Sequence, residues 1–232
     1  MGRAMALRFA KAGMNIVASD VNAETARETA EEATRIGGEA VSVVTDVRDL
    51  SANEALLDAT VDAFGRAHVA CLNAGVAGTS GRLWTITDDD WDWTVGINLR
   101  GVMNGSRTFV PHLVELGDGH VVTTASIAGH VSSPYSGLYN AGKHAVVSLS
   151  ETLYHELRAD GVDVGVTCLC PGFVNTNIIT NARDLADGEA GTPKDDRGER
   201  WLDISERALS AGLDPDAVGN QVHDAVLSNQ FW

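Results

Sequence analysis

The sequence predicts an α/β fold in which helices cover both faces of a parallel β-sheet. Short apolar runs rich in β-branched residues alternate with longer stretches of helical periodicity along almost the whole chain, and this alternation is typical of such sheets. No internal repeat and no linker rich in proline or serine divides the chain. Because 232 residues suit one domain, we expect residues 1–232 to form a single domain.

The N-terminal third predicts three strands, each preceded by a helix. Helical periodicity identifies the helices, and short β-branched runs identify the strands. In order, the sequence predicts a helix from residue 2 to the stop at residues 11–13, a strand over 14–19 that ends at Asp20, a helix over 23–35, a strand that contains Val41, Val43 and Val44, a helix over 51–64, and the strand "AHVACLNAG", which breaks into a loop at Asn73.

The rest of the chain continues the alternation. Thr87 is predicted to cap a helix whose first turn is acidic, where the helix dipole favours anions, and this helical stretch extends to about residue 115. The strand "GHVVTTAS", a helix over 137–159 and the strand "VDVGVTCLCPG" follow. Asp214 and Pro215 begin a last helix that ends near Ser228, with proline at its first position.

Residues 177–205 depart from the alternation. The segment is polar, contains glycines and is long for a connection, and loops of this length are usually lids or disordered. It follows the end of a strand, where open α/β sheets bind ligands. We therefore expect a substrate lid at 177–205, with plain disorder as the alternative.

The composition excludes several classes of partner. A formal net charge of −15 argues against nucleic acid or an anionic membrane, because both are bound through clustered Lys and Arg. No apolar run approaches the roughly 20 residues that cross a bilayer, and the N-terminus lacks the features of a signal peptide. Three cysteines in apolar runs, Cys71, Cys168 and Cys170, predict reduced thiols in a cytoplasmic protein. The histidines lack the spacing of metal ligands, so we expect no metal site.

Four polar residues form the candidate catalytic set. "YNAGK" places the Tyr139 phenol and the Lys143 amine four residues apart, which is one face of a helix. Ser126 ends the strand "GHVVTTAS" at the ligand-binding edge of the sheet, and Asn98 interrupts an otherwise apolar helical stretch. Singly, these are a common surface pair, a turn-forming serine and a helix-bending asparagine. Only their combination indicates a site.

In combination these residues resemble the short-chain dehydrogenase/reductase family, and the resemblance covers nearly the whole chain. The family pattern occurs in the family order at Asp20, Asp46-Val47, Asn73-Ala74-Gly75, Asn98, Ser126, Tyr139, Lys143, Pro171-Gly172 and Thr176. The resemblance implies a doubly wound Rossmann-type fold and an NAD(P)-dependent oxidoreductase. It also implies hydride transfer between the cofactor and a secondary alcohol or carbonyl compound, and a homo-oligomer, either a tetramer or a dimer.

The resemblance assigns a role to each catalytic residue. Tyr139 is the implied general acid/base, and an ammonium within about 4–6 Å is expected to lower the pKa of its phenol by roughly 1–3 units. Lys143 supplies that charge and holds the nicotinamide ribose. Ser126 hydrogen-bonds the substrate oxygen, and Asn98 anchors a water molecule that relays the proton.

For the cofactor, the resemblance implies a dinucleotide site along the edge of the sheet. A carboxylate at Asp20 accepts hydrogen bonds from the adenosine ribose and repels a 2′-phosphate. No Arg or Lys follows it before Arg27, so NAD is favoured over NADP. The other implied cofactor residues are Gly2 at the phosphates, Asp46 and Val47 at the adenine, Asn73, Ala74 and Gly75 beside it, Tyr139 and Lys143 at the nicotinamide ribose, and Pro171, Gly172, Val174 and Thr176 over the carboxamide.

The sequence departs from the family pattern at both ends. Gly2 matches the last glycine of the family's phosphate loop, and the first strand and the two earlier glycines have no counterpart. The family's final strand has none either, because "LSNQFW" stops where that strand begins. We therefore expect the sequence to start at an internal methionine of a longer protein, and to bind a dinucleotide poorly as it stands.

Two other function classes compete with a dehydrogenase. One is a catalytically inactive fold relative that acts as a binding or scaffold protein. The other is an epimerase or dehydratase of the extended relatives, which share the Tyr/Lys pair. The sequence does not name the substrate, and aliphatic, aromatic, steroid and sugar alcohols all remain open. Tyr135, Trp84 and Trp201 are candidate pocket residues, with packing as their alternative role.

Overall fold

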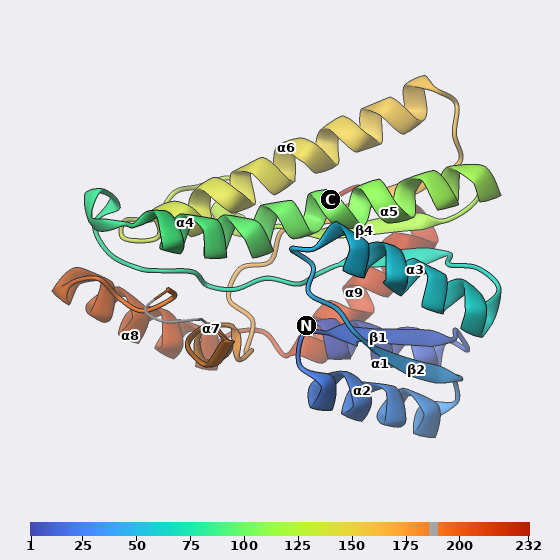
Figure 1. Ribbon diagram of the computed structural model, residues 1–232, viewed down its shortest axis with the longest axis horizontal. Helices are drawn as coiled ribbons and strands as arrows, with labels where there is room; N and C mark the ends of the chain where they lie inside the picture. Colours follow the sequence, from blue (N-terminus) through green and yellow to red (C-terminus); the bar gives the residue numbers. More distant parts are fainter. Residues whose placement is uncertain (186–189) are drawn as a thin grey trace.

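A computed structural model describes residues 1–185 and 190–232 (Figure 1). Helices and strands alternate along the described residues as the sequence predicts. The elements are α1 (Gly2–Lys11), β1 (Ile16–Asp20), α2 (Ala23–Ile36), β2 (Ala40–Val44), α3 (Leu50–Phe64), β3 (Val69–Leu72), the short helix η1 (Leu83–Thr85), α4 (Asp88–Val95), the π-helical turn η2 (Gly96–Arg100), α5 (Gly101–Leu116), β4 (His120–Thr124), the short helix η3 (Ile127–Gly129), α6 (Gly137–Ala159), β5 (Gly165–Leu169), α7 (Ile178–Leu185), α8 (Asp196–Ser210) and α9 (Pro215–Ser228).

The strands form two parallel sheets, whereas the sequence predicts a single sheet. β1 pairs with β2 in one sheet, and β3, β4 and β5 lie in that order in the other. Within the described residues no strand lies between β1 and β3, so no backbone ladder joins the two sheets. The strands are all parallel within each sheet, with Ile16 opposite Ala40 and His120 opposite Gly165.

Helices cover both faces of the larger sheet. Val121 and Val122 are neighbours in β4, so their side chains point to opposite faces. Val121 packs with Leu113 of α5 and Leu157 of α6, whereas Val122 packs with the apolar residues of α1 and α9. In Figure 1, α5 and α6 accordingly lie on one side of the molecule and α1, α2 and α9 on the other. The doubly wound Rossmann-type arrangement is thus confirmed.

The smaller sheet is attached to the rest of the molecule through α1 and α9. Met5 and Phe9 of α1 share one apolar cluster with Ile16 of β1 and Val122 of β4. A Cβ added to Gly219 of α9 would lie 2.7 Å from the Ala4 carbonyl oxygen, closer than a side chain can approach a backbone. The two helices therefore cross at a distance that requires glycine at this position.

The predicted helix starts agree with the capping seen in the structure. Thr87 caps α4 in a capping box with Asp90, and Asp214 caps α9 ahead of Pro215. The long helical stretch predicted to reach residue 115 is divided, because η2 separates α4 from α5. None of the helices among residues 1–185 and 190–232 combines the length and apolar character needed to cross a membrane.

Candidate active site

Ser126 lies just beyond the carboxyl end of β4, as predicted. It is 7 % exposed and caps η3 by accepting a hydrogen bond of 3.2 Å from the Ala128 N–H. Its hydroxyl also makes a long hydrogen bond of 3.5 Å to the Pro171 carbonyl. These two bonds fix the serine between the loop that follows β4 and the loop that follows β5.

Tyr139 and Lys143 share one face of α6, as their spacing predicts. The Lys143 Nζ atom lies 5.6 Å from the centre of the Tyr139 ring. The Ser126 side chain lies near enough to the Tyr139 hydroxyl to act on the pKa of the phenol, which it lowers. The structure therefore brings three of the four predicted catalytic side chains together at the carboxyl end of β4.

Lys143 is buried, with 2 % of its surface exposed. Its amine donates a hydrogen bond of 2.7 Å to the Thr124 carbonyl at the end of β4. Burial lowers the pKa of Lys143 to about 8, although charge on Cys168 and Cys170 opposes the shift. The amine is still mostly protonated at neutral pH, and the strand end holds it in place.

The pKa of Tyr139 moves in the opposite direction to the sequence-based expectation. Burial of the phenol raises its pKa, and the Ser126 side chain opposes this rise only in part. The expected lowering by Lys143 is therefore wrong for the protein by itself. The reason is that the amine points to the Thr124 carbonyl, while the desolvation of the phenol was not visible in the sequence.

Asn98 lies in η2 and braces the loop that follows β3. Its side-chain oxygen accepts a 2.8 Å hydrogen bond from the Val76 N–H, and its side-chain nitrogen donates a 2.9 Å bond to the Val76 carbonyl. A Cβ added to Gly75 would lie 3.2 Å from the Asn98 oxygen and 3.5 Å from the Lys143 Nζ atom. Gly75 thus separates Asn98 from Lys143. The hydrogen bond expected between Asn98 and a water molecule stays a prediction.

Asp20 ends β1 and is exposed. One carboxylate oxygen accepts a 2.9 Å hydrogen bond from the Asn22 N–H. Within the part of the chain that the structure describes, the second carboxylate oxygen has no hydrogen-bond partner, and it suits a vicinal diol such as a ribose. Gly2 lies near the other sheet, because a Cβ added there would come 2.9 Å from the Asn73 side-chain nitrogen.

Asp46 and Val47 lie in the loop that follows β2. The Arg48 guanidinium hydrogen-bonds both Asp46 oxygens and holds the pKa of that carboxyl below its ordinary value. The Val47 carbonyl accepts bonds from the side chains of Asn53 and Asn104. Asp46 is therefore already paired with Arg48, and a hydrogen bond from Asp46 to the adenine of a cofactor would compete with this ion pair.

Residues 171–176 form the loop that follows β5. The Pro171 carbonyl accepts a 2.9 Å bond from the Ile127 N–H, and Gly172 is exposed, with open space where a Cβ would be. Val174 is 3 % exposed and packs in the core with Val122, so only its backbone is available to a ligand. Thr176 is half-buried.

The predicted cofactor residues fall into two groups. Asp20 and Asp46 lie at the end of the smaller sheet, where the Thr45 N–H donates to the Asp20 carbonyl. Ala74, Gly75 and the catalytic residues lie at the end of the larger sheet. Asn73 stands between the groups, since it adjoins Gly2 and accepts a 3.2 Å bond from the Thr124 hydroxyl.

Sequence reasoning missed a buried ion pair beside this site. Asp90 has no exposed surface and lies 3.2 Å from the Lys194 amine, and it also accepts a 2.8 Å bond from the Thr79 hydroxyl. The sequence predicts the acidic residues 88–90 to form the first turn of a helix, and this interpretation gives Asp90 no separate role. The capping-box pattern predicts hydrogen bonds at the helix start and not the burial of its third residue, so the sequence contains no signal of this burial.

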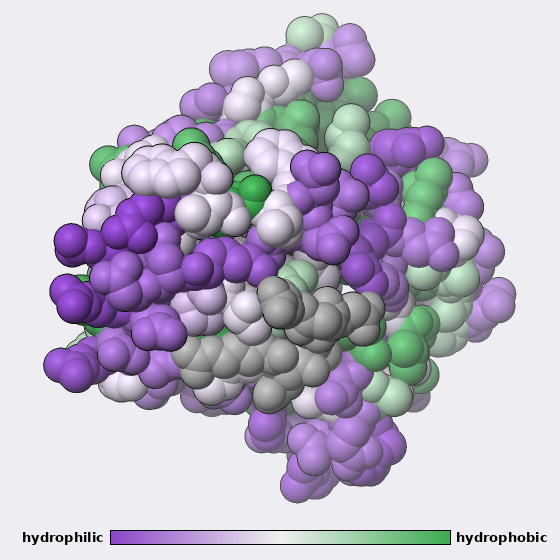
Figure 2. All heavy atoms as spheres, turned by 60° about the vertical axis from the view of Figure 1, so that its left-hand side comes forward, coloured by the Kyte–Doolittle hydropathy of each residue, from purple (hydrophilic) through white to green (hydrophobic). Residues whose placement is uncertain are grey.

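The expected lid includes residues 186–189, which lie outside the described residues. Its remaining part is bound to the loop after β3, because Lys194 donates from its backbone to the Ser80 carbonyl at 2.9 Å and Arg82 pairs with Asp195 at 2.9 Å. Trp201 of α8 donates a 3.0 Å bond to the Ser136 hydroxyl, next to the start of α6. The end of the molecule that carries α7 and α8 comes forward in Figure 2 and is mostly hydrophilic.

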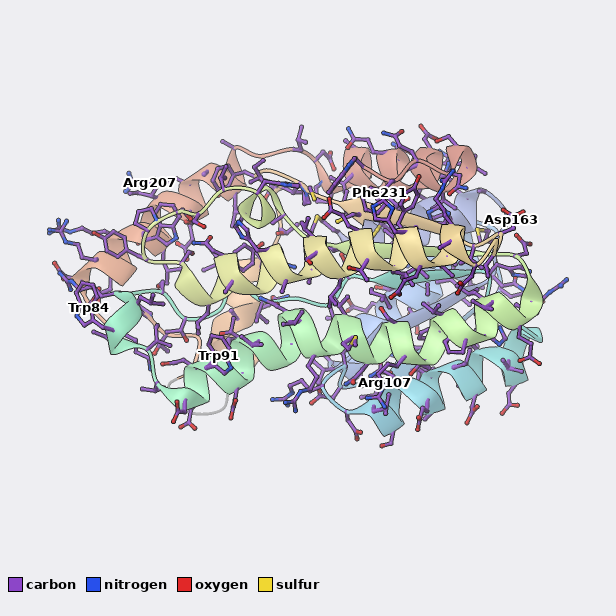
Figure 3. All side chains as sticks on the ribbon, turned by 90° about the horizontal axis from the view of Figure 1, so that it is seen from above. Trp84, Trp91, Arg107, Asp163, Arg207 and Phe231 are labelled. Carbon is purple, nitrogen blue, oxygen red and sulfur yellow. The ribbon has the colours of Figure 1, made fainter. Side chains whose placement is uncertain are left out.

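The other aromatic candidates differ in exposure. Trp84 is 82 % exposed, and Figure 3 shows it at the end of the molecule where α8 carries Arg207. Tyr135 has a φ of 65°, which is unusual for a bulky residue, and its carbonyl accepts a bond from the Gly81 N–H. Among residues 1–185 and 190–232 there is no group of three or more His, Cys, Asp or Glu that could hold a metal ion.

Comparison with known proteins gives one consistent family. The short chain dehydrogenase family model matches residues 1–186. C alpha-dehydrogenase from a Sphingobium species is 31 % identical over 225 residues, which are 97 % of this chain and 73 % of that protein. The "Probable oxidoreductase EphD" of Mycobacterium tuberculosis is 34 % identical over 227 residues, but this chain spans only 37 % of its length.

A solved structure agrees with these sequence matches. A short chain dehydrogenase/reductase from Burkholderia phymatum, crystallised in complex with NAD, is 38 % identical and superimposes with a TM-score of 0.92. The alignment covers 99 % of this chain and 82 % of that one.

Proposed function

The chain belongs to the short-chain dehydrogenase family, and from this premise we propose that it transfers a hydride between NAD and a secondary alcohol or its carbonyl counterpart, with Tyr139 as general acid/base. As a family member it is an oxidoreductase that uses a nicotinamide cofactor on CH–OH groups. One observation carries the finer proposal. The Tyr139 ring lies 5.6 Å from the Lys143 amine, and the Ser126 side chain lies near enough to the Tyr139 hydroxyl to lower its pKa.

The cofactor supplies or accepts the hydride, and the chain's own residues handle the proton. Because burial raises the pKa of Tyr139, its phenol is protonated at neutral pH and suits the role of general acid toward a carbonyl oxygen. The Ser126 hydroxyl lies beside it to bond the same oxygen and stabilise the developing charge. We therefore propose that carbonyl reduction is the direction favoured at neutral pH, and that alcohol oxidation accelerates as pH rises.

Asp20 supports NAD as the cofactor rather than NADP. Its carboxylate is exposed at the end of β1 and would repel a 2′-phosphate. Arg27, the first cation that follows it in the chain, bonds Glu24 and Glu31 of its own helix. A cation already paired in this way is less available to a phosphate.

The test compares two tyrosines of α6. Tyr139→Phe removes the proposed proton donor, so we expect NADH-dependent reduction of a panel of ketones and aldehydes to fall by about 10²-fold or more. The matched control is Tyr154→Phe, because the Tyr154 hydroxyl accepts a hydrogen bond from Arg158 at the far end of α6. Both variants should bind NADH as the unmodified chain does, measured by cofactor fluorescence.

Two outcomes would redirect this proposal. Retention of full turnover by Tyr139→Phe would remove the phenol from the proton-transfer step. Binding of NADH or NADPH without turnover of any member of the panel would favour the alternative of a binding or scaffold protein.

Family membership also supports two further proposals about the protein in the cell. We propose a homo-oligomer, either a tetramer or a dimer, which light scattering on a sizing column would measure. We also propose a cytoplasmic location, which is supported by the thiol state of Cys71, Cys168 and Cys170, because a reducing compartment keeps thiols reduced.

A further inference from the structure

Two cysteines lie side by side behind the candidate active site, and the function proposed above uses neither. Cys168 is in β5 and Cys170 follows the last residue of that strand, so their side chains point to the same side. Their sulfur atoms are 3.8 Å apart, and both are thiols. The pair is already in van der Waals contact.

The two thiols differ in access and in acidity. Cys168 is 1 % exposed, and its N–H donates a 2.6 Å bond to the Phe231 carbonyl. Phe231, labelled in Figure 3 beside α6, packs against the apolar cluster that contains Cys168. Cys170 is partly exposed. The hydrogen bond between the thiols lowers the pKa of Cys168 and raises that of Cys170, and Cys170 is the sulfur that is easier to reach.

The pair is connected to the catalytic side chains on both sides. Leu169, between the two cysteines, is opposite Thr124 in the ladder, and the Thr124 carbonyl receives the Lys143 amine. Pro171, directly after Cys170, accepts the hydrogen bond from Ser126. A displacement of Cys170 therefore moves the acceptor that holds Ser126, and a change of charge on either sulfur acts on Lys143.

We propose that Cys168 and Cys170 form a dithiol that hydrogen peroxide oxidises reversibly to an intramolecular disulfide, and that this disulfide lowers the activity of the neighbouring site. In the first step the O–O bond of the peroxide breaks, one oxygen joins a thiol as a sulfenic acid, and the other leaves as one water molecule. The second sulfur, 3.8 Å away, then attacks the first, the S–O bond breaks and a second water molecule leaves. The two thiols give up two protons and two electrons, and the peroxide takes up both.

Closure of the disulfide requires a local movement. The sulfur atoms must approach to about 2.05 Å, and Cys170 is the partner that moves, because it lies beyond the last ladder pair, Thr124 with Leu169. A disulfide between residues this close in sequence is strained, and strained disulfides are readily reduced. The structure therefore fits a switch better than a permanent crosslink.

The primary test reads mass and does not depend on the proposed function. The purified chain is treated with hydrogen peroxide, quenched in acid, denatured and alkylated with iodoacetamide. Trypsin releases a peptide of residues 159–183 that contains both cysteines. We expect that peptide to lack both alkyl groups and to weigh two mass units less than the dithiol, and we expect dithiothreitol to restore both alkylation sites. Cys71→Ser, which removes an exposed cysteine of β3, should behave as the unmodified chain does.

Single substitutions decide whether the pair acts as a unit. Cys168→Ser and Cys170→Ser should each abolish the loss of two mass units. Sulfinic acid on one cysteine with the other still alkylated, or a disulfide to Cys71, would overturn the proposal. So would an unoxidised pair under conditions that oxidise Cys71.

The activity part of the proposal rests on the proposed function and has its own readout. NADH-dependent turnover should fall at least tenfold with the disulfide, recover with dithiothreitol and be insensitive to peroxide in Cys170→Ser. Unchanged turnover in the fully disulfide-bonded chain would overturn this part. Absence of turnover before oxidation counts against the proposed function, while the mass experiment still decides whether the disulfide forms.

Discussion

At the scale of single residues, burial controls the ionisation of His120. His120, at the start of β4, is 5 % exposed, and burial lowers its pKa from 6.5 to about 4. The Thr167 hydroxyl donates to the Gln230 carbonyl, so it accepts from His120 Nε2 at 2.7 Å. The folded protein therefore holds a neutral imidazole with its proton on Nε2.

This histidine gives the protein a specific sensitivity to acid. Between pH 6.5 and pH 4 the unfolded chain binds a proton at His120 that the folded chain does not, so the free energy of unfolding falls as the pH is lowered through this window. From pH 7.5 to pH 5 the loss due to His120 is about 2 kcal/mol. Urea denaturation of His120→Gln should lack this component.

The matched control for this prediction is His155→Gln. His155 is exposed on α6, so its substitution should leave the pH dependence of unfolding as it is in the unmodified chain. An equal loss of stability in acid for the unmodified chain and His120→Gln would show that His120 titrates normally in the folded state.

The grouping of the candidate catalytic side chains could be predicted from the sequence, but the direction of their pKa shifts could not. Tyr139 and Lys143 are four residues apart in a helical pattern, and Ser126 ends an apolar strand, so local rules were enough to bring them together. The pKa of Tyr139 depends on the desolvation of its phenol and on the direction of the Lys143 amine. Both are consequences of packing between distant segments.

At the scale of elements, a buried ion pair attaches the segment before α8 to the start of α4. Burial alone would raise the pKa of Asp90. Hydrogen bonds from Thr87, Thr79 and Lys194 outweigh burial and hold this pKa below its ordinary value. Removal of one partner leaves a buried charge without its counterion, which costs about 3–5 kcal/mol. We expect Asp90→Asn to lower the free energy of unfolding by about 3 kcal/mol, measured in guanidinium.

An exposed ion pair of α2 provides the control. Glu31 bonds Arg27 with more than half of its side chain exposed, and such pairs contribute less than about 1 kcal/mol. Glu31→Gln should therefore change stability by no more than this amount. Similar effects of the two substitutions would show that water reaches Asp90 and that the pair does not secure the segment.

The helices and their first residues could be predicted from the sequence, whereas contacts between distant segments, such as the Asp90–Lys194 ion pair, could not. Caps such as Thr87 are local, so the start of α4 was predictable. Lys194 is more than a hundred residues from Asp90 in the chain, and no local pattern joins them. The π-helical turn at Gly96–Arg100 was also missed, and Asn98 within it bonds Val76, which lies 22 residues away in the chain.

At the scale of the whole molecule, the crossing of α1 and α9 joins the two sheets. Gly219→Ala places a methyl group 2.7 Å from the Ala4 carbonyl oxygen, and overpacking of this kind costs about 1–3 kcal/mol. We expect hydrogen exchange of the β1 and β2 amides to accelerate more than that of β4. The separation of the helices should weaken the smaller sheet first.

Asn220→Ala tests whether this effect is steric. Asn220 is the next residue of α9 and is exposed, so the substitution changes helix propensity without altering the crossing. It should leave the exchange rates of both sheets close to those of the unmodified chain. Uniform acceleration across β1, β2 and β4 in Gly219→Ala would show that the two sheets unfold together.

The overall architecture was predictable because alternation of strands and helices is a property of the sequence itself. The division into two sheets was not predicted from the strand pattern. It depends on which strands meet, and β1 and β3 look like ordinary interior strands in the sequence.

The burial of His120 has a consequence for handling the protein. Its imidazole is neutral in the folded state, so storage above pH 7, where the unfolded chain leaves this ring neutral as well, should preserve the folded protein. Buffers near pH 5 should shorten its shelf life.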